Sequence, residues 1–222
     1  GSGSSNTNGS ITSTVSANTD AGFSIVSYNG TEANATVGHG LSKAPEMIFT
    51  KNRGAATNWG VYNSSMGTNK VIYLDSTSTA DTDTAVWQNT TPTSSVFSIG
   101  NTTYANADYD YIAYCFHSVD GYSKVGSYIG NNNANGTFVY TSFAPAFILW
   151  KNITDANTNW LMVDNKRDTF NPNDDFLYAN ATTAEEEDYD VDFLSNGFKH
   201  RSSSSWSNGN GKTYIYIAFA ET

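Results

Sequence analysis

Residue types that commonly perform catalysis are sparse in this chain and do not fall at catalytic spacings. It contains no HExxH, GxSxG, GxxxxGK(S/T) or CxxC motif, so patterns for a zinc protease, an α/β-hydrolase and an NTPase are absent. Cys115 has His117 two residues away, but on a strand such side chains share a face without reliably meeting. The second half of the chain has Ala218 at the place of Cys115, which favours a small buried core position. We therefore predict no catalytic residue and no enzymatic activity, with His39 in a glycine-flanked turn and His200 exposed.

Two acidic stretches fall at comparable places in the two halves of the chain, TADTDTA at 79–85 and TAEEEDYDVD at 183–192. Clustered carboxylates on a β-rich scaffold can bind Ca²⁺, which takes about six to eight oxygen ligands. The alternative is a solvated acidic edge that keeps a sheet from pairing with its neighbours, since neither stretch has EF-hand spacing. Paired carboxylates also suit a glycosidase, but the required separation cannot be read from a sequence. The candidate Ca²⁺ ligands are Asp81, Asp83, Glu185, Glu187 and Asp188.

Aromatic residues supply a binding hypothesis. Trp59 and Trp160 recur at matched places in the two halves and are expected in the core. Trp206 lies in SSSSWSNGNG and Tyr104 in NTTYANAD, each just before the last apolar run of its half. A ring at a polar loop tip suits stacking on a sugar, so Tyr104, Trp206 and the unmatched Trp87 are the predicted ligand-binding residues. The alternative is that these rings cover a sheet edge or enter a subunit contact. A ligand-facing Trp206 could be replaced by Ala with little change in melting temperature.

The elements that must position these side chains are β-strands. Apolar runs are short and are bounded by Gly, Asn, Pro or Asp, and no window shows a sustained helical period. Pro45 and Pro145 occupy matched strand entries, where a missing N–H costs no ladder hydrogen bond. The acidic segment DYDVDF at 188–193 alternates with period two, as a strand with one wet face does.

Four blocks of sequence recur in the same order in both halves, which indicates an internal repeat. The pairs are GFSIVSYNG (22–30) with GYSKVGSYIG (121–130), APEMIFTKN (44–52) with APAFILWKN (144–152), TNWGVYN (57–63) with TNWLMVDN (158–165), and YIAYCF (111–116) with YIYIAF (214–219). We predict an all-β protein of two tandem antiparallel β-sandwich domains, jelly-roll-like, over residues 20–119 and 120–222. The low-complexity residues 1–19 are expected to be a linker or the remnant of a stalk.

Composition and charge restrict the classes of partner that the chain is expected to bind. Of 222 residues only 11 are Lys or Arg, and the formal net charge is −10. Nucleic-acid binding needs clustered cations, so nucleic acid is not an expected partner. No apolar run reaches the length of a membrane-spanning helix.

Several longer strings point to a family. VGHGLSKAPEMIFTKNR, TTPTSSVFSIG, YIAYCFHSVDGYSKVGSYIGN, FLSNGFK and TYIYIAFAE resemble the tandem repeats of structural, tail-fibre-like proteins of marine bacteriophages, over nearly everything from Ile11 to the end. The resemblance implies a virion protein and implies no known catalytic residues.

The functional expectation follows from this resemblance and from the aromatic loops. It is a non-enzymatic virion structural protein, a tail-fibre or fibre-like module that adheres to a host-surface glycan or receptor. The expected location is the surface of the virion, and the expected partners are other virion proteins and further copies of the chain in a homotrimer. One alternative is a capsid decoration or filament-forming protein whose surfaces are consumed by subunit contacts. A lesser alternative is a glycan-degrading enzyme of the tailspike type.

Overall fold

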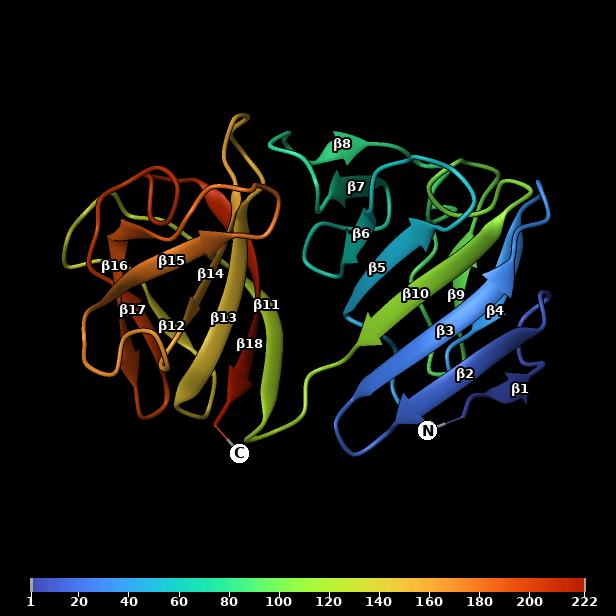
Figure 1. Ribbon diagram of the computed structural model, residues 1–222, viewed down its shortest axis with the longest axis horizontal. Helices are drawn as coiled ribbons and strands as arrows, with labels where there is room; N and C mark the ends of the chain where they lie inside the picture. Colours follow the sequence, from blue (N-terminus) through green and yellow to red (C-terminus); the bar gives the residue numbers. More distant parts are fainter. Residues whose placement is uncertain (1, 222) are drawn as a thin grey trace. The chain divides into compact units, whose positions relative to one another are not determined.

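The computed structural model describes residues 2–221, which form strands, turns and loops only (Figure 1). Each recorded strand pair is antiparallel. The predicted all-β, antiparallel class is therefore confirmed. Nothing in the described part of the chain is a helix long and apolar enough to cross a membrane.

The chain divides into two compact β units. Unit 1 consists of Gly1–Leu74 and Ala80–Ser118, and unit 2 consists of Asp75–Thr79 and Val119–Thr222. Each unit buries its own cluster of apolar side chains.

Unit 1 has ten strands within the described residues. Eight of them pair in the order β1-β2-β3-β10-β5-β6-β7-β8, and β4 pairs with β9 in a small second sheet. The bounds are β1 Ser4–Asn6, β2 Ser13–Asn18, β3 Phe23–Asn29, β4 Ala35–Gly38, β5 Met47–Asn52, β6 Gly60–Asn63, β7 Lys70–Tyr73, β8 Asp81–Thr82, β9 Val96–Ile99 and β10 Asp110–Phe116.

Unit 2 places its eight described strands in one sheet, in the order β11-β18-β13-β14-β15-β16-β17-β12. Its two end strands, β11 and β12, follow each other along the chain, and the sheet curls into a nearly closed, barrel-like form (Figure 1). The bounds are β11 Ser123–Ile129, β12 Phe138–Tyr140, β13 Pro145–Asn152, β14 Trp160–Asp164, β15 Asn173–Tyr178, β16 Glu186–Leu194, β17 Gly197–His200 and β18 Thr213–Ala220.

The two units repeat one strand plan. In unit 1 the run β3-β10-β5-β6-β7-β8 corresponds, strand by strand, to β11-β18-β13-β14-β15-β16 in unit 2. The pair β4-β9 likewise corresponds to β12-β17. The four repeated sequence blocks lie on or beside β3, β5, β6 and β10 in unit 1 and β11, β13, β14 and β18 in unit 2. The repeated blocks therefore encode the same four strands of the plan twice.

The segment expected to be a linker, residues 1–19, differs from that expectation. It contains β1 and β2, and β2 adds to the free edge of β3 from the Thr14–Ser27 pair to the Asn18–Phe23 pair. This segment forms regular structure because its side chains alternate between buried and exposed. Ile11, Ser13 and Val15 are buried, while the residues between them are exposed. Because many of these positions are serine or threonine, the alternation does not show as a hydrophobic pattern in the sequence.

Two stacked tyrosines lie in the core of each unit. The rings of Tyr28 and Tyr111 are 5.3 Å apart with an interplanar angle of 9°. Tyr128 and Tyr214 repeat the arrangement at 4.8 Å and 6°. The pair joins β3 to its neighbour β10 in unit 1, and the equivalent strands β11 and β18 in unit 2.

A buried histidine distinguishes the core of unit 2. His200 ends β17, whereas Ile99 ends the equivalent strand β9. The imidazole lies 4.9 Å from the ring of Tyr128, 5.5 Å from Trp150 and 5.6 Å from Phe198, and neither ring nitrogen has a hydrogen-bond partner among the described residues. Burial lowers the pKa of His200 to about 3. The expectation that His200 is exposed is wrong, because the strand turns its last side chain inward.

We expect unit 2 to lose stability as the pH falls below about 6.5, the ordinary histidine pKa. The pKa of the folded state lies below that of the unfolded chain, so the unfolded chain takes up a proton that the buried ring excludes. The loss in free energy of unfolding grows toward pH 3 and reaches on the order of 3–5 kcal/mol. Urea denaturation followed through NMR signals of unit 2 measures it. His200→Ile, which copies unit 1, should flatten the slope; a variant that keeps the full slope contradicts the assignment.

Candidate functional site

The loops that precede the last strands carry the two predicted ligand-binding rings at equivalent positions. The side-chain amide of Asn52 donates to the carbonyl just before Tyr104, at 3.2 Å. The amide of Asn152 donates in the same way to the carbonyl just before Trp206, at 2.8 Å. The loops are also held by the core tyrosines, whose hydroxyls donate to loop carbonyls in both units.

Both rings fold back against the core of their unit. Tyr104 is half-buried with its ring 4.9 Å from that of Tyr73. Trp206 is half-buried and stacks on Tyr189 at 5.7 Å, with Tyr178 at 5.8 Å on another side. Both side chains pack against the hydrophobic core of their unit and do not stand free at a loop tip.

Trp87 does not reach solvent. It is 1% exposed, lies in the core of unit 1 and contacts the ring of Tyr62 at 5.7 Å. Its prediction as a ligand-binding residue is therefore wrong, because the loop that carries it turns inward to fill the core. Among the matched tryptophans, Trp160 is buried as expected and Trp59 is half-buried.

The rings that do face solvent lie elsewhere. Within the described residues, the exposed aromatic side chains are Tyr109, Phe138, Tyr140 and Phe170, with Phe170 84% exposed. Two of them, Phe138 and Tyr140, flank the buried Val139 on β12 and so project from the same outer face of one strand. The period-two string FVY next to polar NNNANGT is the signal that sequence reasoning missed.

We call Phe138 and Tyr140 the β12 aromatic face. Phe138 pairs with Lys199 across the ladder and Tyr140 pairs with Gly197. A Cβ at Gly197 would lie 2.2 Å from the backbone oxygen of Val139 and 3.0 Å from carbon atoms of the Phe138 ring, so glycine lets the β12 backbone and this ring lie close to β17. The face is a shallow apolar platform with an ammonium group beside it.

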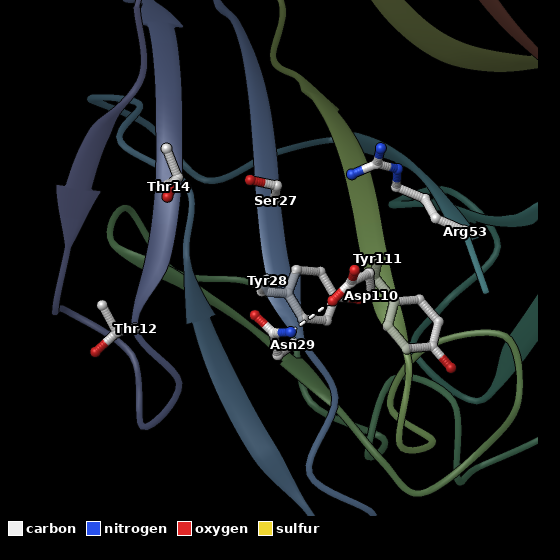
Figure 2. A pocket seen from close by; sticks show the side chains of 8 residues that line it. All are labelled: Thr12, Thr14, Ser27, Tyr28, Asn29, Arg53, Asp110 and Tyr111. Carbon is white, nitrogen blue, oxygen red and sulfur yellow. Dashed lines mark hydrogen bonds between the residues drawn. The ribbon is translucent and has the colours of Figure 1, made fainter.

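A polar shelf lies on the outer side of unit 1, in a pocket of about 220 Å³ (Figure 2). Thr14 on β2 and Ser27 on β3 present hydroxyls, and Asn29 donates to Asp110 at 2.5 Å. Arg53 stands at the other side, exposed and in no ion pair within the described residues. One wall of the shelf is β2, and unit 2 has no strand equivalent to β2 among the described residues. Unit 2 therefore has no counterpart to this shelf in the described part of the chain.

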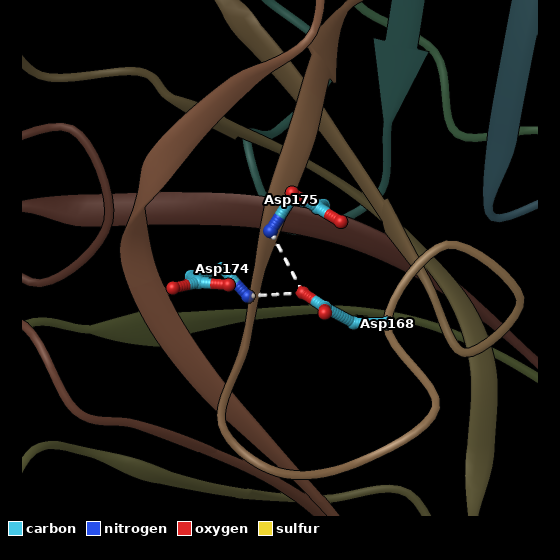
Figure 3. A group of neighbouring side chains, drawn as sticks. All are labelled: Asp168, Asp174 and Asp175. Carbon is cyan, nitrogen blue, oxygen red and sulfur yellow. Dashed lines mark hydrogen bonds between the residues drawn. The ribbon is translucent and has the colours of Figure 1, made fainter.

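The structure does not bring the predicted Ca²⁺ ligands into one cluster. The only group of three metal-ligating side chains found among residues 2–221 is instead Asp168, Asp174 and Asp175, whose ligand atoms lie within 4.8 Å of one another (Figure 3). Asp168 Oδ2 accepts the backbone N–H of Asp174 at 2.7 Å and of Asp175 at 2.9 Å. Glu187 lies close by, opposite Asp175 in the ladder, and Glu185 pairs with Arg167. Asp81, Asp83 and Asp188 take no part in the cluster.

Unequal proton affinities follow from this geometry. Burial raises the pKa of the Asp168 carboxyl, but the two backbone N–H groups outweigh it and hold the pKa below its usual range. Burial, a hydrogen bond to Asp168 and repulsion by that carboxylate raise the pKa of Asp174. The cluster therefore has one firmly charged carboxylate that receives hydrogen bonds, beside a neighbour that resists ionisation.

The nucleophile and imidazoles considered from the sequence have structural roles. Cys115 is fully buried, as predicted, and burial raises its pKa to about 12. His39 is buried in its glycine-flanked turn, where Nδ1 accepts the N–H of Leu41 and Nε2 lies 3.1 Å from Thr93 O. A thiol that stays protonated is not a nucleophile.

The comparisons with known proteins place the chain in a family without assigning it an activity. Residues 1–222 match the model of a family described as a domain of unknown function (DUF7483), and the chain belongs to that family. No curated protein and no solved structure matches it.

We expect Trp206→Ala to lower the free energy of unfolding of unit 2 by about 2–3 kcal/mol, because it removes a half-buried ring from an aromatic stack. Phe170→Ala, which truncates a ring that is 84% exposed, is the matched control and should change it by no more than about 0.5 kcal/mol. Calorimetric melting of both variants tests this. An unchanged melting temperature for Trp206→Ala would return the ring to the ligand-facing role expected from the sequence.

Proposed function

We propose that this member of the DUF7483 family is a non-enzymatic virion structural protein, a fibre-like module that adheres to host-surface glycans. The resemblance to phage tandem repeats supports the virion setting. The observation that carries the adhesive role is the β12 aromatic face, where Phe138 is 43% and Tyr140 62% exposed.

Exposed rings on a rigid strand suit a sugar chain. The apolar face of a sugar ring stacks on an aromatic ring, and each such contact contributes about 1 kcal/mol beyond area burial. Residues two apart on a strand lie roughly 6.5 Å apart, so one glycan chain could cover both rings. Lys199 beside Phe138 adds a donor for hydroxyl or acidic groups of the same chain.

The proposal includes the finer architecture expected from the sequence, a flattened, jelly-roll-like sandwich in each unit. The pairing of β15 supports it. Phe176 and the residues before it pair with β16, whereas Leu177 and Tyr178 pair with β14, so β15 passes from one layer to the other. Such a frame holds outer-face rings at fixed spacing.

Assembly belongs to the same proposal. Two stacking contacts bind weakly, so useful adhesion requires several modules engaged together, as in a homotrimer on a particle. The net charge of −10 disfavours non-specific clumping while specific contacts form.

The second candidate is a decoration or filament-forming protein. It is favoured by the position of β12 at one end of the sheet order, since an end strand with exposed rings can pair with another copy. The two candidates differ in what covers Phe138 and Tyr140.

We expect the double variant Phe138→Ala and Tyr140→Ala to lose retention on immobilised host-surface polysaccharide by tenfold or more, with an unchanged melting temperature. Two stacking contacts of about 1 kcal/mol each account for that factor. Ile129→Ala, another exposed apolar position in unit 2, is the control and should bind normally. Sedimentation of the same proteins separates the candidates: a loss of oligomers without a loss of glycan retention supports subunit contact instead.

A further inference from the structure

A pocket at one end of unit 2 lies outside the β12 aromatic face. Its volume is about 220 Å³, and its walls come from the start of β13, the loop 165–172 between β14 and β15, and Phe193 on β16. The loop is fixed by Asn171, which accepts the N–H of Phe193 and donates to its carbonyl, both at 2.8 Å. The pocket is thus a built feature of the fold, with its outer wall held to the sheet.

Unit 1 closes its equivalent end differently. The loop between β6 and β7 covers residues 64–69 and is two residues shorter than 165–172. It begins with Ser64, whose N–H donates to Glu46 O as that of Asn165 donates to Ala146 O. The shorter loop buries Met66, which is 7% exposed. The longer loop of unit 2 carries polar side chains over the pocket instead.

Two residues that line this pocket each carry a buried carbonyl oxygen without a hydrogen-bond partner among the described residues. Asn173 is 2% exposed, and its Oδ1 has no hydrogen-bond partner among the described residues. The orientation of this amide is fixed, because Nδ2 donates to Asn171 Oδ1 at 2.9 Å and to Val191 O at 3.4 Å. Asn165 Oδ1, from the loop, is likewise buried and without a partner in the described chain. A buried carbonyl oxygen without a donor is costly, so both atoms favour an occupant that can donate a hydrogen bond.

Charge restricts that ligand further. Asp168 also lines the pocket, and it lies within the carboxylate cluster with Asp174 and Asp175 (Figure 3). Arg167 is occupied by ion pairs with Asp164 and Glu185. The local charge is therefore negative, which repels uronic acids, sulfated sugars and other anions.

The rim supplies apolar surface. Phe170 is 84% exposed at the mouth and Phe193 is half-buried in the wall. Carbonyl and carboxylate acceptors beside an aromatic ring match a compound with hydroxyl donors on its edge and an apolar face. A volume below the usual range for drug-sized ligands limits the occupant to one small ring.

We propose that this pocket binds one neutral sugar unit, with hydroxyls donating to Asn165 Oδ1, Asn173 Oδ1 and Asp168, and with Phe170 covering its apolar face. The inference rests on the proposed glycan adhesion and adds a second subsite with its own preference. The subsite selects an uncharged unit, whereas Lys199 beside the β12 aromatic face tolerates an acidic one.

The test uses the full chain with glucose, galactose, mannose, N-acetylglucosamine and glucuronate as probes, in NMR titrations. We expect at least one neutral sugar to shift the amide signals of residues 165–173, and glucuronate to bind at least tenfold more weakly. Asn165→Ala and Phe170→Ala should each weaken the binding of that neutral sugar at least tenfold. Ser64→Ala, the equivalent change in unit 1, and the Phe138→Ala and Tyr140→Ala double variant should leave it unchanged. The melting temperature of each variant shows whether it is folded.

The outcomes separate the two proposals. Retention on polysaccharide that depends on Phe138 and Tyr140, with no neutral sugar at residues 165–173, overturns the pocket and leaves the adhesive role standing. If a neutral sugar binds at residues 165–173 but the protein is not retained on polysaccharide, the pocket proposal is supported and the β12 aromatic face is ruled out as a glycan site. Calcium chloride alone shifting residues 165–175 while no sugar does so overturns the sugar assignment, as does equal binding of glucuronate.

Discussion

Each unit depends on the hydrogen bonds that its core tyrosines make with the loop before its last strand. The phenol of Tyr28 donates to Ala105 O at 2.8 Å, and that of Tyr128 donates to Ser207 O at the same distance. Burial raises the pKa of both phenols well above the ordinary value, so both remain protonated donors at neutral pH. A buried hydroxyl must have a partner, and the partner here is a loop that would otherwise be loose. Together with the amides of Asn52 and Asn152, these phenols hold the loop and the ring that it carries against the core.

Much of the strand plan could be predicted because four of its strands are encoded by sequence blocks that occur in both halves of the chain. The repeated apolar strings YIAYCF and YIYIAF can be recognised from local pattern alone, and the segment 188–193 lies in the strand β16 as expected. Its burial does not follow the expected period of two, because the neighbours Val191 and Asp192 are both buried. β1 and β2 could not be found in the same way, since serine, threonine and asparagine supply their exposed positions and part of the buried ones. Their order comes from the free edge of β3, which exists only after the sheet has formed.

The candidate site was harder to predict from the sequence, because the sheet, and not the residue type, decides whether a side chain points inward or outward. Trp87 and His200 point inward, although both lie in polar stretches, and Phe138 points outward although it is apolar. The cluster of Asp168 with Asp174 and Asp175 depends on how the loop 165–172 returns, with a register shift between Asn173 and Asp175. Folded-back loops of this kind bring residues together without a regular spacing, so no periodic pattern marks them.

The antiparallel neighbours β11 and β18 have a mechanical consequence. In unit 2 the first strand of the sheet begins at Ser123 and the last one ends at Ala220, and Ser123 is paired with Phe219. A pull along the chain therefore loads the ladder at one end and opens its hydrogen bonds one pair after another, instead of shearing all of them at once. In unit 1 the hairpin of β2 on β3 moves the point of loading away from the corresponding pair, Phe23 with Phe116. Under tension the two units are therefore loaded at different places, the β1–β2 extension in unit 1 and the β11–β18 ladder in unit 2.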